Sequence, residues 1–145
     1  MQNKPVNLFL LTAGCFLAFF IFGFTDNLKG PTLPPMIEEL SIDYGTGGNI
    51  FFSLYLGFLV ATLITGILAD RFGLKTVIVL AGMCLALGVG GYSSFSSTSL
   101  LGLSLFVVGL GLGGFELGPN ALVVSLYHER KGLYLNLMAV LHGLG

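Results

Sequence analysis

Charged residues are the scarcest component of this 145-residue chain. Asp, Glu, Lys and Arg together make up 9% of it, whereas apolar residues make up 54%. Soluble domains carry about 25% charged residues, so this chain lacks the polar surface that contact with water requires. Its mean hydropathy of +0.93 points the same way. We therefore expect a protein whose surroundings are the hydrocarbon core of a lipid bilayer.

Cations and cysteines are also few. Six Lys and Arg residues stand against seven Asp and Glu residues, which gives a net charge of -1. Proteins that bind nucleic acid normally carry a basic surface, so no nucleic-acid partner is expected. The two cysteines, Cys15 and Cys84, lie in separate apolar runs, as small buried residues do.

Sequence motifs of catalysis and of metal binding are missing. The chain has no phosphate-binding loop, no H-E-x-x-H motif and no G-x-S-x-G motif. His128 and His142 form no metal-ligand pattern. We expect His128 in a loop and His142 in contact with another helix, with a position facing a cavity as the alternative for His142. The sequence thus predicts no enzyme, no cofactor and no metal site.

Long apolar runs are abundant, and they define the expected fold. At about 20 residues per membrane span, the chain accommodates four spanning helices and the start of a fifth. We predict an all-α polytopic membrane protein with spans at 6–38, 46–69, 75–93, 99–126 and a truncated 133–145. Because the last apolar run has barely begun at Gly145, we expect an incomplete N-terminal six-helix domain of a longer protein.

The segments between these spans are predicted to be turns and loops. They are a turn-like run at 44–49, a charged loop at 70–75, a polar turn at 93–99 and a second charged loop at 127–132. Small residues recur at four-residue spacing within the spans, where they allow neighbouring helices to approach closely. They are Gly82, Ala86 and Gly90 in the third span, and the pairs Gly109 with Gly113 and Gly114 with Gly118 in the fourth.

The first span allows two interpretations. In one, the helix ends near Thr25 and an outer loop follows. In the other, which we favour, the helix continues towards Glu38 and is bent by its glycine and prolines. Asp26 and Lys29 would then lie at membrane depth, three residues apart on one helix, where they could neutralise one another. Asn27 would accompany them.

The cations predict how the chain is oriented in the membrane. All but one of them fall on one side of the expected layout: Lys4, Arg71, Lys75, Arg130 and Lys131. The opposite side carries Glu38, Glu39 and Asp43. By the positive-inside rule, the N-terminus and the two basic loops are cytoplasmic.

Glu116 is the clearest functional candidate, because it lies inside the long apolar fourth span. A charge at the bilayer centre costs about 3 kcal/mol, so such residues usually face a cavity or a partner. Asn120 follows four residues later on the same helical face, and Pro119 removes a backbone donor between them. This pattern predicts a polar cavity wall whose carboxyl exchanges protons. A structural hydrogen bond or a buried ion pair between helices is the alternative.

The stretch GILADRFGLK, from Gly66 to Lys75, resembles the loop between the second and third helices of the major facilitator superfamily of secondary transporters. That loop is usually written G-x-L-A-D-R-x-G-R-K. Seven positions match and one, Leu74, departs from the usual basic residue. The resemblance implies a conformational role for this loop, with Gly66, Asp70, Arg71, Gly73 and Lys75 as its key residues. A charged loop that only sets topology is the alternative.

Three further segments resemble a narrower group, the fucose permease-like branch of proton-coupled sugar symporters. They are FFIFGFTDNLKGPTLP, GFELGPNAL and LYLNLMAVLHGLG. The resemblance implies that Glu116 is the proton-linked carboxylate and that Asn120 and Asn27 line the substrate cavity. The branch has an Asp at the position of Gly30, whereas this chain has Asp26 one turn earlier.

The resemblance implies twelve helices in two halves, with the substrate site between the halves. We expect a secondary active transporter of the plasma membrane that carries a small polar solute, a sugar or related metabolite, by alternating access and proton symport. Sodium is the alternative coupling ion. The alternative functions are a proton-driven exporter of drugs or metabolites and a non-transporting membrane sensor or assembly protein.

Overall fold

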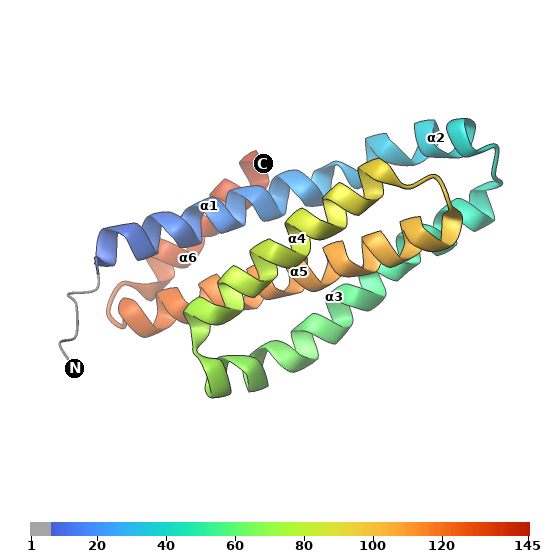
Figure 1. The fold of residues 1–145 in the computed structure, drawn as a ribbon. Helices are drawn as coiled ribbons and strands as arrows, with labels where there is room; N and C mark the ends of the chain where they lie inside the picture. The colour runs from blue at the N-terminus through green and yellow to red at the C-terminus, as the bar shows by residue number, and fades with distance from the viewer. Residues whose placement is uncertain (1–6) are drawn as a thin grey trace.

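The computed structural model describes residues 7–145, which form six helices and no strand (Figure 1). In chain order they are α1 (Leu8–Asn27), α2 (Lys29–Leu40), α3 (Tyr44–Phe72), α4 (Leu74–Ser94), α5 (Thr98–Leu126) and α6 (Lys131–Leu144). Val6, with which the first span was expected to begin, and Lys4 lie outside the described residues.

Four of these helices, α1, α3, α4 and α5, are long and apolar enough to cross a membrane. The 29 residues of α3 and of α5 correspond to about 43 Å of helix, which exceeds the roughly 30 Å hydrocarbon core of a bilayer. Both helices are therefore long enough to cross this core even when they are tilted. The prediction of an all-α polytopic membrane protein is confirmed.

The connections lie at two opposite ends of the bundle. The start of α1 shares one end with the α3–α4 and α5–α6 connections, and the α2–α3 and α4–α5 connections share the other (Figure 1). The cations Arg71, Lys75, Arg130 and Lys131 consequently gather at the first end. The acidic residues Glu38, Glu39 and Asp43 lie at the second.

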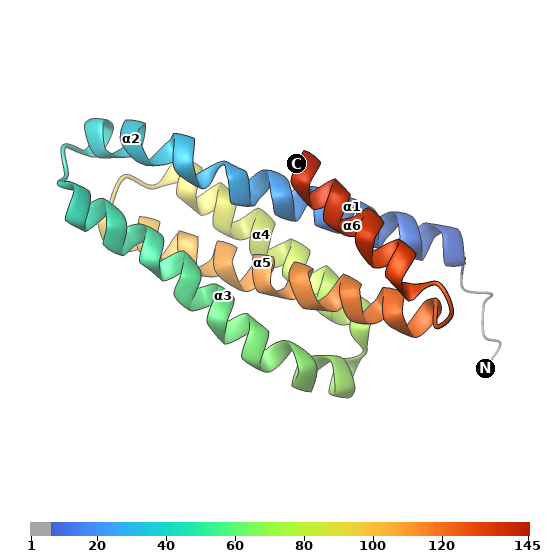
Figure 2. The ribbon, with the colours of Figure 1, turned by 180° about the vertical axis from the view of Figure 1, so that it is seen from behind.

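Helix α5 occupies the centre of the bundle. It packs against α1, α3, α4 and α6, and 56% of its most apolar stretch is buried, against 33% or less in the other three spans (Figures 1 and 2). One glycine face meets α3, where a Cβ at Gly109 would overlap the carbonyl oxygen of Leu54. The other face meets α4, where a Cβ at Gly114 would lie 2.6 Å from the Cβ of Ala81. The predicted glycine pairs of this span are thus contact faces.

Within residues 7–145, only Gly82 of the small-residue face predicted for the third span lies at a helix contact, where a Cβ would be 3.6 Å from the Phe115 ring. Ala86 and Gly90 are exposed, and a Cβ at Gly90 would meet nothing within 4 Å. The contact with α5 uses Ala81, Leu85 and Gly88, where a Cβ at Gly88 would lie 2.6 Å from the backbone nitrogen of Val108. Because α4 is apolar around its whole circumference, spacing alone fits several faces, and the glycines of α5 select among them.

The connections are shorter than predicted. Residues 44–49 form the first turns of α3, because the Asp43 carboxylate accepts the Thr46 backbone N–H at 2.6 Å and the Thr46 hydroxyl at 3.1 Å. The predicted loop at 70–75 shrinks to Gly73, whose φ of 84° suits glycine. Polar residues at the bundle ends continue the helices because water or headgroups can solvate them.

The other two connections shorten in the same way. Helix α4 continues to Ser94, so the expected polar turn at 93–99 contracts to residues 95–97. Helix α6 begins at Lys131, which leaves residues 127–130 between α5 and α6.

The chain stays helical beyond Thr25, as in the interpretation that we favoured, but it breaks once at Leu28. Helix α1 ends at Asn27 and α2 begins at Lys29, with Leu28 itself at φ -68° and ψ -18°. Pro31 explains the break, since it has no N–H for the Asn27 carbonyl and its ring crowds that oxygen. The two helices together form one bent rod on the outside of the bundle (Figure 2).

Candidate functional site

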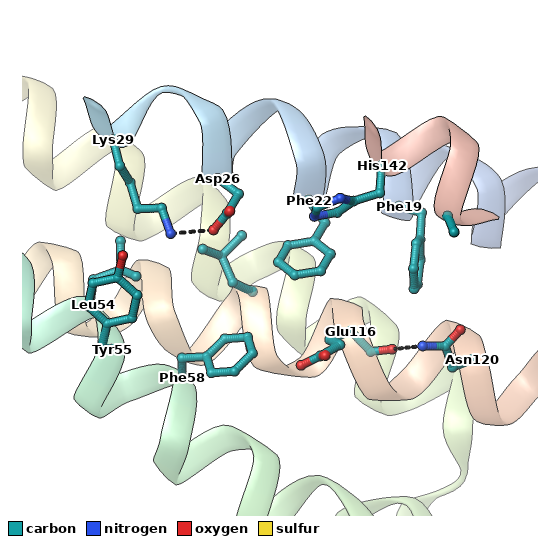
Figure 3. Close-up of a pocket in the computed structure, with 12 residues that line it drawn as sticks. Phe19, Phe22, Asp26, Lys29, Leu54, Tyr55, Phe58, Glu116, Asn120 and His142 are labelled. Atoms are coloured by element: carbon teal, nitrogen blue, oxygen red, sulfur yellow. Dashed lines mark hydrogen bonds and ion pairs between the residues drawn. The ribbon is translucent and has the colours of Figure 1, made fainter. Parts of the chain in front are cut away.

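A cavity of about 510 Å³ lies between the α1–α2 rod, α3, α5 and α6 (Figure 3). Both ionisable and aromatic side chains line it. The residues are Phe19, Phe22, Asp26, Lys29, Leu54, Tyr55, Phe58, Leu112, Glu116, Asn120, Ala139 and His142. Five of the six helices therefore contribute to one site, and the predicted Glu116, Asn120, Asp26 and Lys29 are brought together in it.

Asp26 and Lys29 form an ion pair across the break at Leu28, as their spacing predicted. The Lys29 ammonium donates a hydrogen bond to Asp26 Oδ1 (Figure 3). It also lies 4.8 Å from the centroid of the Tyr55 ring on α3, within the range of a cation–π contact. The side chain of Lys29 is 17% exposed and that of Asp26 is 38% exposed. The positive charge is thus held by two groups at the cavity wall.

Glu116 is half-buried in the cavity wall, and within residues 7–145 its carboxylate forms no hydrogen bond or ion pair. The Asn120 side-chain amide donates instead to the backbone carbonyl oxygen of Glu116 at 2.8 Å. The two side chains therefore share a helix face without bonding to one another, and the Glu116 carboxylate is directed towards Phe58 (Figure 3). An unpaired carboxyl in such a place is free to bind a proton, an ion or a solute.

Aromatic rings form most of the remaining wall. The centroid of the His142 ring lies 4.5 Å from that of the Phe22 ring and 6.5 Å from that of the Phe19 ring. Both pairs are arranged edge to face. Helix α6 reaches this position because a glycine at 23 lets it touch α1, where a Cβ would overlap the His142 carbonyl oxygen. His142 thus satisfies both alternatives, since it packs on another helix and faces the cavity.

Sequence reasoning missed the aromatic residues, because 13 Phe and 5 Tyr are spread over the whole chain. The hydroxyl of Tyr55 gave no clear signal either, because Ser53, Thr62 and Thr65 also carry hydroxyls in the same span. Asn27, in contrast, was predicted to line the cavity, but it is exposed at the end of α1 and is not among the lining residues.

The charged residues of the 70–75 segment lie at the cationic end, away from the cavity. Asp70, Arg71 and Lys75 are exposed, and no ion pair forms among them in the part of the chain that the structure describes. Arg71 lies over the Phe72 ring at 5.4 Å from its centroid. Asp70 does not cap α4, whose N-terminal position is taken by Gly73 without a side-chain hydrogen bond.

Within residues 7–145, no group of three or more His, Cys, Asp or Glu side chains is arranged to hold a metal ion. A bundle of apolar helices that surrounds a cavity with charged side chains defines a multi-pass integral membrane protein with an internal polar site. Residues 15–145 match the model of the Major Facilitator Superfamily, and the chain belongs to this family.

The chain is similar to several curated members of this family. It is 31% identical to Bypass of stop codon protein 6 of Saccharomyces cerevisiae, over 93% of this chain and 27% of that protein. It is 35% identical to the 4-hydroxybenzoate transporter PcaK of Pseudomonas putida, over 74% of this chain and 23% of that one. It is 22% identical to the Sodium-dependent glucose transporter 1 of Rattus norvegicus, over 88% of this chain and 26% of that protein.

The chain therefore spans about a quarter of the length of these relatives. Two of these three relatives are named as transporters, one for 4-hydroxybenzoate and one for glucose. No solved structure matches the chain.

Proposed function

We propose that the full-length protein is a secondary active transporter that moves a small polar solute by alternating access. The observation that carries this proposal is the cavity of about 510 Å³ with Asp26, Lys29 and Glu116 in its wall, in a chain of the Major Facilitator Superfamily. In this proposal, the described helices form most of an N-terminal six-helix domain, with the spans predicted from the sequence. They supply one wall of the substrate site. A second half would supply the opposite wall.

Glu116 is the proposed coupling residue. Its carboxylate is unpaired, whereas the other carboxylate of the cavity, Asp26, is held by Lys29. An unpaired carboxyl that faces the cavity is placed to bind a proton in one state of the transport cycle and to release it in another. Sodium is the alternative coupling ion, and the rat relative is named as a sodium-dependent transporter.

The proposed substrate is a sugar or a related small metabolite. The aromatic rings of the wall offer flat apolar faces, and Asn120 and Tyr55 offer hydrogen-bonding groups between them. The resemblance to the fucose permease-like branch supports a sugar. The relatives named for glucose and for 4-hydroxybenzoate support a small polar solute in general.

The cluster of Asp70, Arg71 and Lys75 is proposed to control the conformational change. These side chains are exposed next to the one-residue connection at Gly73, and none is committed to an ion pair within residues 7–145. They are therefore available to bind a neighbouring part of the full-length protein in one conformation and to release it in the other. We further propose a plasma-membrane location with the cationic end in the cytoplasm.

The test uses the full-length protein in liposomes. Proton movement is recorded as each sugar of a panel is added, for the native chain and for Glu116→Gln. We expect sugar-dependent alkalinisation of the outer solution in the native protein and its loss in the variant, because glutamine keeps the size of the side chain but cannot bind a proton. The rate should fall at least about 100-fold, in line with the loss of a proton-transfer group.

The control is Glu129→Gln, which removes an exposed carboxylate outside the cavity and should leave the signal unchanged. Sodium-dependent uptake without proton movement would show that sodium, and not the proton, is the coupling ion. Proton release driven by lipophilic compounds would identify an exporter. A native protein that moves no solute under any of these gradients would contradict the transporter proposal and leave a sensor or assembly role.

A further inference from the structure

We propose, on the basis of the transporter function above, that Asp26 determines the charge of the solute that the cavity accepts. By holding the Lys29 ammonium, Asp26 makes the site select uncharged polar solutes and exclude carboxylate anions. The proposal deepens the function of the same cavity, since it names the substrate class and the residue that sets it.

The first support is that the positive charge of Lys29 is already occupied. The ammonium contacts the Asp26 carboxylate on one side and the Tyr55 ring on another, and only 17% of the side chain is exposed. A solute carboxylate would therefore have to displace Asp26 from a formed ion pair. It would also leave that carboxylate without its cation at the cavity wall, which is costly away from bulk water.

The second support is the charge of the rest of the wall. Helix α3 contributes only the neutral side chains Leu54, Tyr55 and Phe58. Helix α5 adds the carboxyl of Glu116, and α6 adds the imidazole of His142. Because Lys29 is paired with Asp26, the part of the wall that residues 7–145 supply offers no unpaired Lys or Arg to a solute anion.

The third support is the apolar part of the lining. Phe19, Phe22 and Phe58 present rings to the cavity, and a solute with an apolar ring face can stack on them (Figure 3). The second oxygen of Asp26 and the side-chain oxygen of Asn120 remain able to accept hydrogen bonds, because Asn120 uses its nitrogen for Glu116. Uncharged ring compounds with O–H or N–H donors match this combination of groups.

The first experiment reads the charge of the cavity without requiring transport. A single reporter cysteine, Ala139→Cys, is placed in the lining of the full-length protein, with the other cysteines replaced. The rates of its reaction with an anionic and with a cationic methanethiosulfonate reagent are compared. Asp26→Asn should raise the ratio of anionic to cationic rates about tenfold, because the freed ammonium acts on the cavity at a reduced effective dielectric constant.

Matched variants separate charge from structure. Lys29→Gln should lower the same ratio, since it leaves Asp26 unpaired, and the double variant of Asp26→Asn with Lys29→Gln should return near the native value. A purely structural role for the pair predicts that the single and double variants lose stability without this ordered change in the ratio. A ratio in Asp26→Asn within twofold of the native ratio would overturn the proposal.

The second experiment measures protection of the reporter by pairs of solutes that differ at one group, which is uncharged in one member and a carboxylate in the other. The probes are D-glucose with D-glucuronate, and 4-hydroxybenzamide with 4-hydroxybenzoate. The uncharged member of at least one pair should protect the native protein at a concentration at least tenfold lower than its anion, and Asp26→Asn should narrow or reverse that difference. Stronger protection by the anion in both pairs, or no protection by either uncharged solute, would contradict the substrate class.

The two proposals can fail separately. If the reagent ratios and the protection follow the expected order while liposomes show no solute movement, the charge selectivity stands and the transport function fails. If transport occurs but carboxylate anions are preferred, the transport function is supported and the proposal that Asp26 excludes anions is contradicted.

Discussion

The carboxylate of Asp43 shows what a single residue contributes to this fold. It accepts the backbone N–H of Thr46 and then the Thr46 hydroxyl, and these bonds lower the pKa of Asp43 below its usual value of 3.8. Because the folded pKa is lowered, the stabilisation of α3 by this cap is fully present above the usual pKa and is lost as the pH falls through the lower folded value. The first turn of α3 depends on this residue, since the glycines that follow it favour helix poorly.

We therefore predict that Asp43→Ala loosens the start of α3. The Thr46 amide should exchange its hydrogen about fivefold faster at pH 7, because an uncapped helix N-terminus frays. In the native protein, the protection of this amide, corrected for the intrinsic rate, should decrease between pH 5 and pH 2. Hydrogen–deuterium exchange checks both effects. Asp70→Ala, which removes an exposed carboxylate without a capping bond, should change nothing at Thr46, and equal protection in Asp43→Ala would contradict the prediction.

The site residues that could be predicted from the sequence are the charged ones, because a charged side chain costs free energy in lipid. Glu116 stands out in the sequence because a carboxyl inside a long apolar run needs a reason to be there. Tyr55 and Phe58 do not stand out, because aromatic residues are as suitable for lipid contact as for a cavity wall. Asn27 was assigned to the cavity by resemblance, and the break at Leu28 instead leaves it exposed at the end of α1.

At the scale of helices, α5 depends on having no side chain at two opposite positions of its surface. Gly109 touches the backbone of α3, and Gly111 touches that of α4, where a Cβ would lie 2.8 Å from the Ala81 carbonyl oxygen. Close backbone approach of this kind lets van der Waals packing hold helices together where lipid provides no hydrophobic driving force.

We predict that Gly109→Ala destabilises the bundle by about 3 kcal/mol, the upper part of the range for overpacking, because the added carbon overlaps the rigid Leu54 backbone. Thermal unfolding of the full-length protein in detergent, followed by size-exclusion chromatography, measures the effect. Gly90→Ala is the matched control, since its Cβ meets open space and alanine favours helix. It should unfold at the native temperature or above. Equal unfolding temperatures for the two variants would contradict the packing at Gly109.

At the scale of the whole molecule, the two ends of the bundle differ in charge, and this difference gives the proposed orientation its test. Ser96, in the α4–α5 turn, and Glu129, in the α5–α6 turn, are both exposed at opposite ends. We predict that Ser96→Cys reacts with a membrane-impermeant maleimide in intact cells, because the proposed orientation places the acidic end outside. A cysteine at position 129 should react only after the cells are permeabilised. The opposite pattern would reverse the orientation.

The sequence by itself determined the solvent of this protein, the number of its spans and the ends at which its charges gather. These follow from composition and from the length of apolar runs, because a bilayer of fixed thickness selects helices of fixed minimum length. It also predicted the contact faces of α5, because its glycines at four-residue spacing are the positions where α3 and α4 approach closely.

Only the tertiary structure decided which face of α4 is buried and which side chains meet in the cavity. A helix in lipid is apolar on every side, so the contrast that marks the buried face of a soluble helix is absent. The cavity joins residues that are remote in the chain, such as Asp26, Tyr55 and His142, through helix crossings at glycines. Their meeting is a property of packing between helices, which local sequence patterns do not record.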